Sequence, residues 1–133
     1  MKASQKPIPV LRNLISFPFI SIIIVPFVIT DIFVEVYHRI CFPLYKISYV
    51  KRSSYIKIDR HKLKYLRWYE KIGCAYCGYG NGLLHYLSEI AARTETYWCG
   101  IKHAKDPHVK LQEHQKDFFE YGDEEKLNQF LGR

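Results

Sequence analysis

The chain has 133 residues, of which 48% are hydrophobic and 16% aromatic, and its formal net charge is +7. This length accommodates one domain, or a membrane segment followed by a small domain. The charge is uneven, because residues 1–104 hold 15 Lys/Arg against 6 Asp/Glu and residues 105–133 hold 5 against 7. The basic residues begin directly beside an apolar stretch. This arrangement favours anionic membrane lipids over nucleic acid as the partner.

A basic tail, residues 1–12, precedes an uncharged run of 17 residues, 14–30. Such a run is at the lower limit for a membrane-spanning helix. A single tilted span of about residues 13–36 would place Asp31 and Glu35 near its end, where a charge costs less.

Two prolines in the apolar run make a second geometry possible for this segment. Pro18 and Pro26 would kink a helix, so a re-entrant segment broken near Pro26 is the alternative to a span. Residues 34–50 mix aromatic and basic side chains, a pattern typical of a segment lying along lipid headgroups, and Pro43 is expected to end any helix there. Residues 13–50 are therefore predicted to form the membrane anchor and an interfacial segment.

Residues 51–105 are predicted to form a small helical domain. Asp59 can cap a helix over about residues 60–72. The Gly-rich residues 74–82 indicate a turn, and a second helix is expected over about residues 83–96.

Residues 106–133 are predicted to form C-terminal helices. Asp106-Pro107 is a helix start signal, and Asp123 can cap a last short helix that ends near Leu131. The expected fold is therefore mainly α, with an N-terminal membrane-anchoring helix or re-entrant segment followed by a small helical domain with a Gly-rich Cys loop.

The most specific motif is Cys74-x2-Cys77-x21-Cys99-x3-His103. Two Cys separated by a short turn can direct both sulfurs at one ion, and a Cys3His set favours zinc, with iron as the alternative. Four protein ligands leave no open coordination position, so the site would be structural or sensing and not hydrolytic. A helix of about 14 residues between the two halves, roughly 21 Å long, is an obstacle to closure.

Three other interpretations of the thiols stay open. Cys74 and Cys77 fit a redox-active dithiol, with Cys99 structural. A disulfide framework would need an oxidising compartment, and plain buried thiols are common in protein cores.

Helix-borne carboxylates and a histidine form a second candidate metal cluster, of the kind that builds dinuclear centres. Its members are Glu70, His85, Glu89 and Glu95. The usual Glu-x2-His spacing is absent. The alternative is a surface network in which these carboxylates pair with Lys71 or Arg93.

Several short motifs resemble those of a family of small bacterial membrane-associated proteins. They are Ile40-Cys-Phe-Pro43, Asp59-Arg60, Cys74-x2-Cys77, Asn81-Gly82, Glu89-Ile90 and Thr94-Glu95-x-Tyr97-Trp98-Cys99-x-Ile101-Lys102-His103-Ala104. The family has Pro after the third Cys, where this chain has Gly100. The resemblance covers about residues 34–105 and implies no particular activity.

Two function hypotheses follow. The first is a membrane-anchored accessory or assembly protein, with a Cys3His site fixing its helices and a larger membrane complex as a partner. The second is a membrane-bound redox or metal-dependent enzyme that acts on a lipid-like or quinone-like substrate. Three Lys/Arg precede the apolar segment and five lie in residues 38–58, which favours a cytoplasmic C-terminal domain. The resemblance to bacterial proteins implies that the membrane is the bacterial inner membrane.

Overall fold

A computed structural model describes residues 10–133, and it confirms the mainly α fold. The predicted basic tail, residues 1–12, therefore lies mostly outside the described residues. The helical elements in chain order are α1 (Val10–Ile22), α2 (Ile24–Tyr45), η1 (Arg52–Ser54), η2 (Arg60–Lys62), α3 (Trp68–Trp98), η3 (Glu113–Gln115) and α4 (Glu124–Leu131). Within residues 10–133 β-pairing is limited to one isolated parallel bridge, between Ile101 and Phe119.

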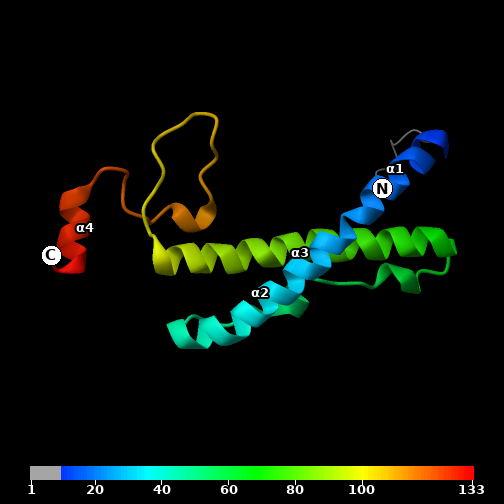
Figure 1. Cartoon of the computed structure of the whole chain (residues 1–133), viewed down its shortest axis with the longest axis horizontal. Helices are drawn as coiled ribbons and strands as arrows, with labels where there is room; N and C mark the ends of the chain where they lie inside the picture. Colours follow the sequence, from blue (N-terminus) through cyan, green and yellow to red (C-terminus); the bar gives the residue numbers. More distant parts are fainter. Residues whose placement is uncertain (1–9) are drawn as a thin grey trace.

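α1 and α2 form one long apolar helical stretch with a break at Ile23 (Figure 1). Pro26 explains the break, because it has no N–H and its ring crowds the carbonyl four residues earlier, that of Ile22. The chain bends there and runs on without reversing, so the re-entrant alternative is not formed. Leu11–Tyr45 is long and apolar enough to cross a membrane, by length and composition.

The expectation that Pro43 ends the helix is wrong. α2 continues through Pro43 to Tyr45 and ends at Lys46, whose φ is 57°. The Lys46 N–H donates to the carbonyls of Phe42 and Pro43, and this left-handed cap ends the helix after Tyr45 and not just before Pro43 as predicted. Much of the expected interfacial segment is therefore part of α2.

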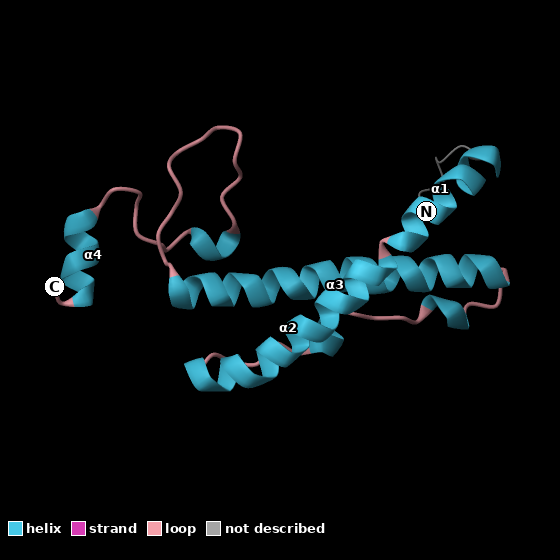
Figure 2. Cartoon of the chain, viewed as in Figure 1, coloured by secondary structure: helices cyan, strands magenta, loops and turns pink. Residues whose placement is uncertain are grey.

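The expected Gly-rich Cys loop is also wrong, because residues 74–82 lie inside the continuous helix α3 (Figure 2). The glycines are close-approach sites. A β-carbon at Gly80 would lie 3.1 Å from the Phe27 ring, and one at Gly82 would lie 2.7 Å from the carbonyl oxygen of Tyr55. Glycine here lets neighbouring segments contact the helix backbone. The expected helix over residues 60–72 is reduced to η2, and α3 begins only at Trp68.

The core forms where α2 crosses α3 and residues 46–67 return beside them (Figure 1). It is small, and its buried members are Phe42, Val50, Leu83, Tyr86 and Ile90. Most apolar side chains of α1 and α2 face outward instead and are exposed.

The C-terminal part confirms one predicted helix and corrects the other. α4 is capped by the Asp123 side chain, which accepts from the N–H of Lys126, as expected. The segment after Asp106 is a loop containing η3, because the Asp106 carboxylate accepts the N–H of His108 and closes a local turn. Gln115 and Phe118 are then buried on the way to α4.

The close approach at Gly82 gives a first prediction. Gly82→Ala should lower the free energy of unfolding by about 1–3 kcal/mol, because the new methyl group meets the backbone of Tyr55 and Ile56. Denaturation followed by circular dichroism in detergent micelles measures the change. Gly73→Ala is the matched control in the same helix, where the methyl group meets nothing within 4 Å and should stabilise by about 0.5–1 kcal/mol. Equal effects at both positions would contradict the packing.

Candidate functional site

The structure does not bring the predicted Cys3His ligands together. Cys74 and Cys77 lie in the first half of α3, and Cys99 directly follows its last residue. Cys77 and Cys99 are 22 residues apart along one helix, which corresponds to about 33 Å. A single ion in one chain cannot contact both, because the loop on which closure depended is helical.

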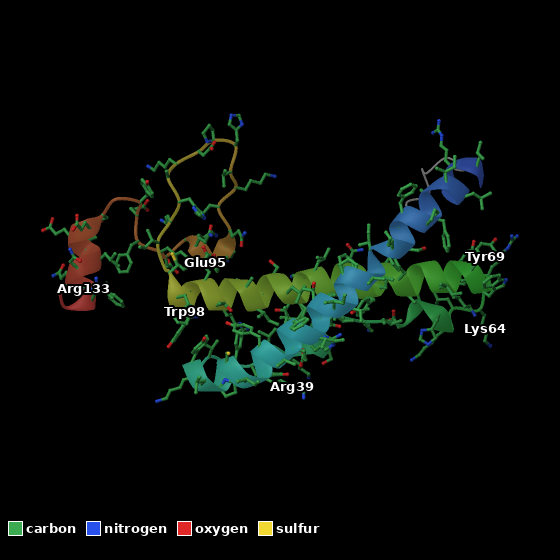
Figure 3. The ribbon with its side chains drawn as sticks, viewed as in Figure 1. Arg39, Lys64, Tyr69, Glu95, Trp98 and Arg133 are labelled. Carbon is green, nitrogen blue, oxygen red and sulfur yellow. The ribbon has the colours of Figure 1, made fainter. Side chains whose placement is uncertain are left out.

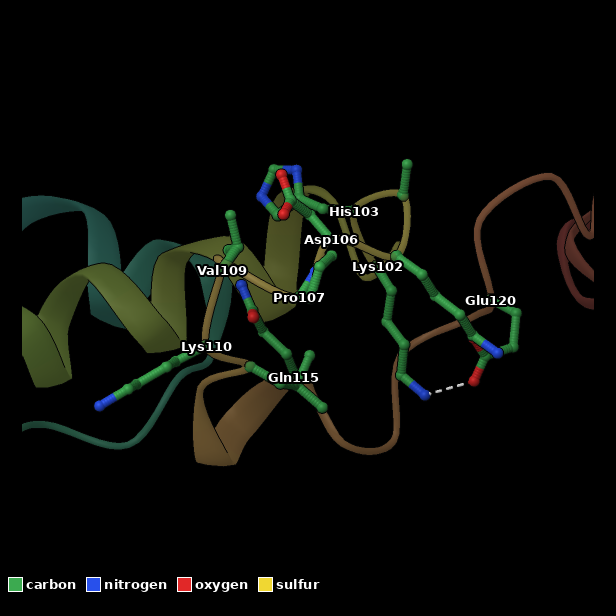
Figure 4. A pocket seen from close by; sticks show the side chains of 11 residues that line it. Lys102, His103, Asp106, Pro107, Val109, Lys110, Gln115 and Glu120 are labelled. Atoms are coloured by element: carbon green, nitrogen blue, oxygen red, sulfur yellow. Dashed lines mark hydrogen bonds and ion pairs between the residues drawn. The ribbon is translucent and has the colours of Figure 1, made fainter.

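His103 lies beyond α3 in the C-terminal loop. It lines a surface depression together with Lys102 and Asp106, and an ion pair between Lys102 and Glu120 closes one side of this depression (Figure 4). No Cys side chain lines it. His103 is therefore positioned by this loop and is separated from the Cys74–Cys77 pair.

The alternative cluster is likewise dispersed along α3. Glu70 accepts the N–H of Arg67 at 2.8 Å and so caps the start of the helix. His85 packs edge-on against the Tyr55 ring, with centroids 4.8 Å apart. Residues 10–133 contain no group of three or more His, Cys, Asp or Glu side chains placed to hold an ion.

The other two carboxylates of that cluster make local pairs. Glu89 bonds Arg93 at 2.8 Å, as the surface-network alternative predicted. Glu95 lies near the C-terminal end of α3 (Figure 3), where its oxygens contact His114 Nε2 at 2.6 Å and Gln115 Nε2 at 3.0 Å. These contacts hold η3 on the helix, and the hydrogen bond to His114 lowers the pKa of Glu95 below its usual range.

The structure reveals a different polar site, which we call the α2–α3 polar cluster. Its members are Asp31, Glu35, His38, Arg52, Tyr79 and Tyr86. Asp31, Glu35 and His38 lie at positions i, i+4 and i+7 of α2 and therefore share one helix face. The two tyrosines are seven residues apart on α3 and meet that face.

Asp31 binds an arginine and a tyrosine of the cluster. Arg52, in η1, pairs with both of its carboxylate oxygens, with Nη2 at 2.7 Å, and the Tyr79 hydroxyl donates to it at 2.7 Å. The hydrogen bond to Asp31 raises the pKa of Arg52 above its ordinary value. Burial, followed by the hydrogen bond to Asp31, raises the pKa of Tyr79 to about 12. Arg52 therefore stays charged and Tyr79 stays a donor.

Glu35 is bound from three directions. The Tyr86 hydroxyl donates at 2.8 Å, the Tyr49 hydroxyl at 3.0 Å, and Arg39 Nε at 2.9 Å. Asp31 and Glu35 therefore each bind one arginine and at least one tyrosine hydroxyl.

His38 is fully buried and joins the cluster to the segment that follows α2. The N–H of Val50 donates to His38 Nε2 at 3.0 Å, so Nε2 is an acceptor and the imidazole is neutral, with its proton on Nδ1. Nδ1 lies 3.0 Å from the Tyr86 hydroxyl, whose own proton goes to Glu35. A directed chain of hydrogen bonds therefore runs from His38 through Tyr86 to Glu35.

This arrangement is suited to holding helices together. Among the described residues, no buried side-chain nitrogen or oxygen lacks a hydrogen-bond partner. The depression beside the cluster is lined by Asp31, Glu35, Arg39 and Arg52, whose charges already neutralise one another. The spacing of Asp31, Glu35 and His38 along the sequence was the signal that could have identified this face.

Over residues 10–133, these features define a helical protein with one apolar segment able to cross a membrane and a satisfied polar cluster on that segment. No family model, curated protein or solved structure matches the chain. The geometry is therefore the basis for the functional proposal.

The Asp31–Arg52 pair gives a second prediction. Arg52→Gln should lower the free energy of unfolding by about 2 kcal/mol, because Asp31 then lies in a largely apolar surrounding without its counter-charge. Adding Asp31→Asn should restore part of the loss, since no unpaired charge remains. Chemical denaturation of the native chain, the two single variants and the double variant in detergent gives the coupling energy.

Arg39→Gln is the control for this pair, because Arg39 also binds a carboxylate of α2 but has a 70% exposed side chain. It should shift the unfolding midpoint much less. A loss equal to that of Arg52→Gln would show that the position of the charge in the cluster does not matter.

The lowered pKa of Glu95 gives a third prediction. Its folded-state pKa is below the ordinary 4.5, so the stabilisation is present above pH 4.5 and is lost as the pH falls through the folded-state value. The Gln115 side-chain amide signals in NMR spectra should therefore shift over that acidic range as η3 detaches. Glu95→Gln should abolish this titration, and Glu113→Gln, at an exposed position of η3, should leave it unchanged. An unaltered titration in Glu95→Gln would contradict the assignment.

Proposed function

We propose that this is a membrane-anchored accessory or assembly protein in which α1 and α2 insert into the bilayer and α3 is fixed to them by the α2–α3 polar cluster. The observation that carries the proposal is the exposure of apolar side chains along Leu11–Tyr45. Among the exposed ones are Phe17, Phe19, Val28, Phe33, Ile40 and Leu44. A continuous apolar surface of this kind is characteristic of contact with lipid or with another apolar protein surface.

The polar cluster supports the same proposal. A free carboxylate at the bilayer centre costs about 2.5–3.5 kcal/mol. Asp31 and Glu35 avoid much of this cost, because their oxygens bind Arg52, Tyr79 and Tyr86 from the same chain. The partners needed to make α2 compatible with a membrane are thus built into the fold.

The return segment after α2 supports an anionic lipid surface as a partner. Its Lys and Arg side chains are mostly exposed, among them Lys46, Lys51, Lys57, Arg60, Lys62 and Lys64. Each basic residue close to such a surface contributes about 1 kcal/mol of attraction. The same bias supports an orientation with the C-terminal part of the chain on the cytoplasmic side. The resemblance to bacterial membrane-associated proteins supports the inner membrane as the location.

A scaffold role fits the chemistry better than catalysis does. The carboxylates predicted for a dinuclear centre are engaged in a helix cap, a local ion pair and the contact with η3. The polar cluster has its donors and acceptors matched within the chain. What stays exposed is helix surface, which suits assembly with other chains.

Membrane fractionation tests this proposal. The full chain should remain in the membrane pellet after an alkaline carbonate wash. Ile15→Asp combined with Phe19→Asp should move at least ten times more protein into the soluble fraction, because each charge opposes insertion by about 2.5–3.5 kcal/mol. Both positions are exposed, so the substitutions leave the core intact.

Val109→Asp combined with Leu111→Asp is the control, because these exposed apolar residues lie in the C-terminal loop. This pair should leave the distribution unchanged. Release of the native chain by carbonate would overturn the anchor.

A further inference from the structure

Cys74 and Cys77 form an accessible thiol pair on α3. They are three residues apart, so they are neighbours on one helix face with β-carbons about 5–6 Å apart. Cys77 is exposed, Cys74 is half-buried, and neither is in a disulfide. A Zn–S bond of about 2.3 Å places two sulfurs about 3.8 Å apart on one tetrahedral ion, a spacing that this pair can reach by side-chain rotation.

The chain does not supply the other two ligands. No third His, Cys, Asp or Glu joins the pair among residues 10–133, and residues 1–9 contain none of these types. Cys99 is about 33 Å away along the helix. Glu70, one turn before Cys74, is bound to the Arg67 N–H. The pair is therefore half of a four-coordinate site.

The helix surface around the pair leaves room for a second helix. A β-carbon at Gly73 would meet nothing within 4 Å, and Asn81 on the same face is exposed. Gly73 and Cys77 are small residues four apart, a spacing that allows two helix backbones to approach closely. The rest of the chain occupies the opposite side of α3, where Gly80 meets Phe27 and Gly82 meets Tyr55, and it borders the pair on the Cys74 side, where Gly78 meets the Lys57 carbonyl.

We propose that two copies of the chain bind one zinc ion through Cys74 and Cys77 of each copy. A two-fold axis through the ion makes the contact isologous and completes a tetrahedron of four thiolates. Each thiol releases its proton to solvent when it binds the metal. The ligands belong to α3 and not to the apolar segment Leu11–Tyr45, although Tyr76 and Gly80 contact Ile20 and Phe27 of that segment.

A different pairing would use Cys99 and His103 of the second copy. Cys77 and Cys99 do share a helix face, because 22 residues are about 6.1 turns. Glu95 lies on that face, however, and His114 and Gln115 cover it at 2.6 and 3.0 Å. An antiparallel partner helix would have to displace η3. The four-cysteine site requires no such displacement.

Zinc titration of the full chain in detergent micelles tests the proposal. Purified protein should bind 0.5 zinc per chain, measured by elemental analysis, and light scattering should show a dimer that EDTA converts to monomers. Cobalt in place of zinc should give the intense thiolate-to-metal absorption of a four-sulfur site. A native chain that binds no zinc, or that stays monomeric with zinc bound, would overturn the proposal without use of any variant.

Cysteine substitutions then identify the ligands. Cys74→Ser combined with Cys77→Ser should abolish both zinc binding and dimerisation, while Cys99→Ser, the matched control, should retain 0.5 zinc per chain. Circular dichroism confirms that each variant is folded. One zinc per chain that Cys99→Ser removes would favour the Cys3His pairing and overturn the four-cysteine site. The double variant should still resist carbonate extraction, which separates this result from failure of the anchor.

Discussion

Two carboxylates on the apolar helix α2 need charged and hydrogen-bonding partners, and the rest of the structure supplies them. Asp31 and Glu35 sit on α2 between turns that are almost entirely hydrophobic, and neither can be left without partners in such surroundings. Arg52 and Tyr86 supply the main ones. Arg52 reaches Asp31 only because the chain turns back immediately after α2. Tyr86 reaches Glu35 only because α3 crosses α2 at that level. The polar cluster therefore determines both the return of the chain and the site of the crossing.

The continuity of α3 follows from the same requirement. Tyr79 and Tyr86 are seven residues apart, and they address Asp31 and Glu35 from one face only if the backbone between them is helical. A loop at Gly80 and Gly82 would turn one hydroxyl away. Glycine weakens a helix by up to about 1 kcal/mol per residue. Here that loss is offset by the contacts that the absent side chains allow.

Local signals in the sequence identified the elements whose structure is decided locally. The cap at Asp123 and the apolar character of α1 and α2 depend on neighbouring residues, and both were predicted correctly. The pairing of Glu89 with Arg93, one turn apart, was predicted for the same reason. The joining of the two expected helices into α3 depends on contacts with residues far away in the sequence. A glycine run usually indicates a turn, but these contacts place it in a helix. No local pattern predicts them.

The candidate sites also combine features that local sequence predicts with features that depend on distant contacts. The Cys and His spacing suggested one metal site because a loop was assumed between its halves, whereas helical geometry makes the 22-residue gap a rigid distance of about 33 Å. The polar cluster had a helical signature in Asp31, Glu35 and His38, but its meaning depended on which helix would face them. The thiol pair and the polar cluster are therefore best understood as two uses of one helix. One face of α3 satisfies the charges of α2, and this leaves the opposite face, with Cys77 exposed, to interact outside the chain.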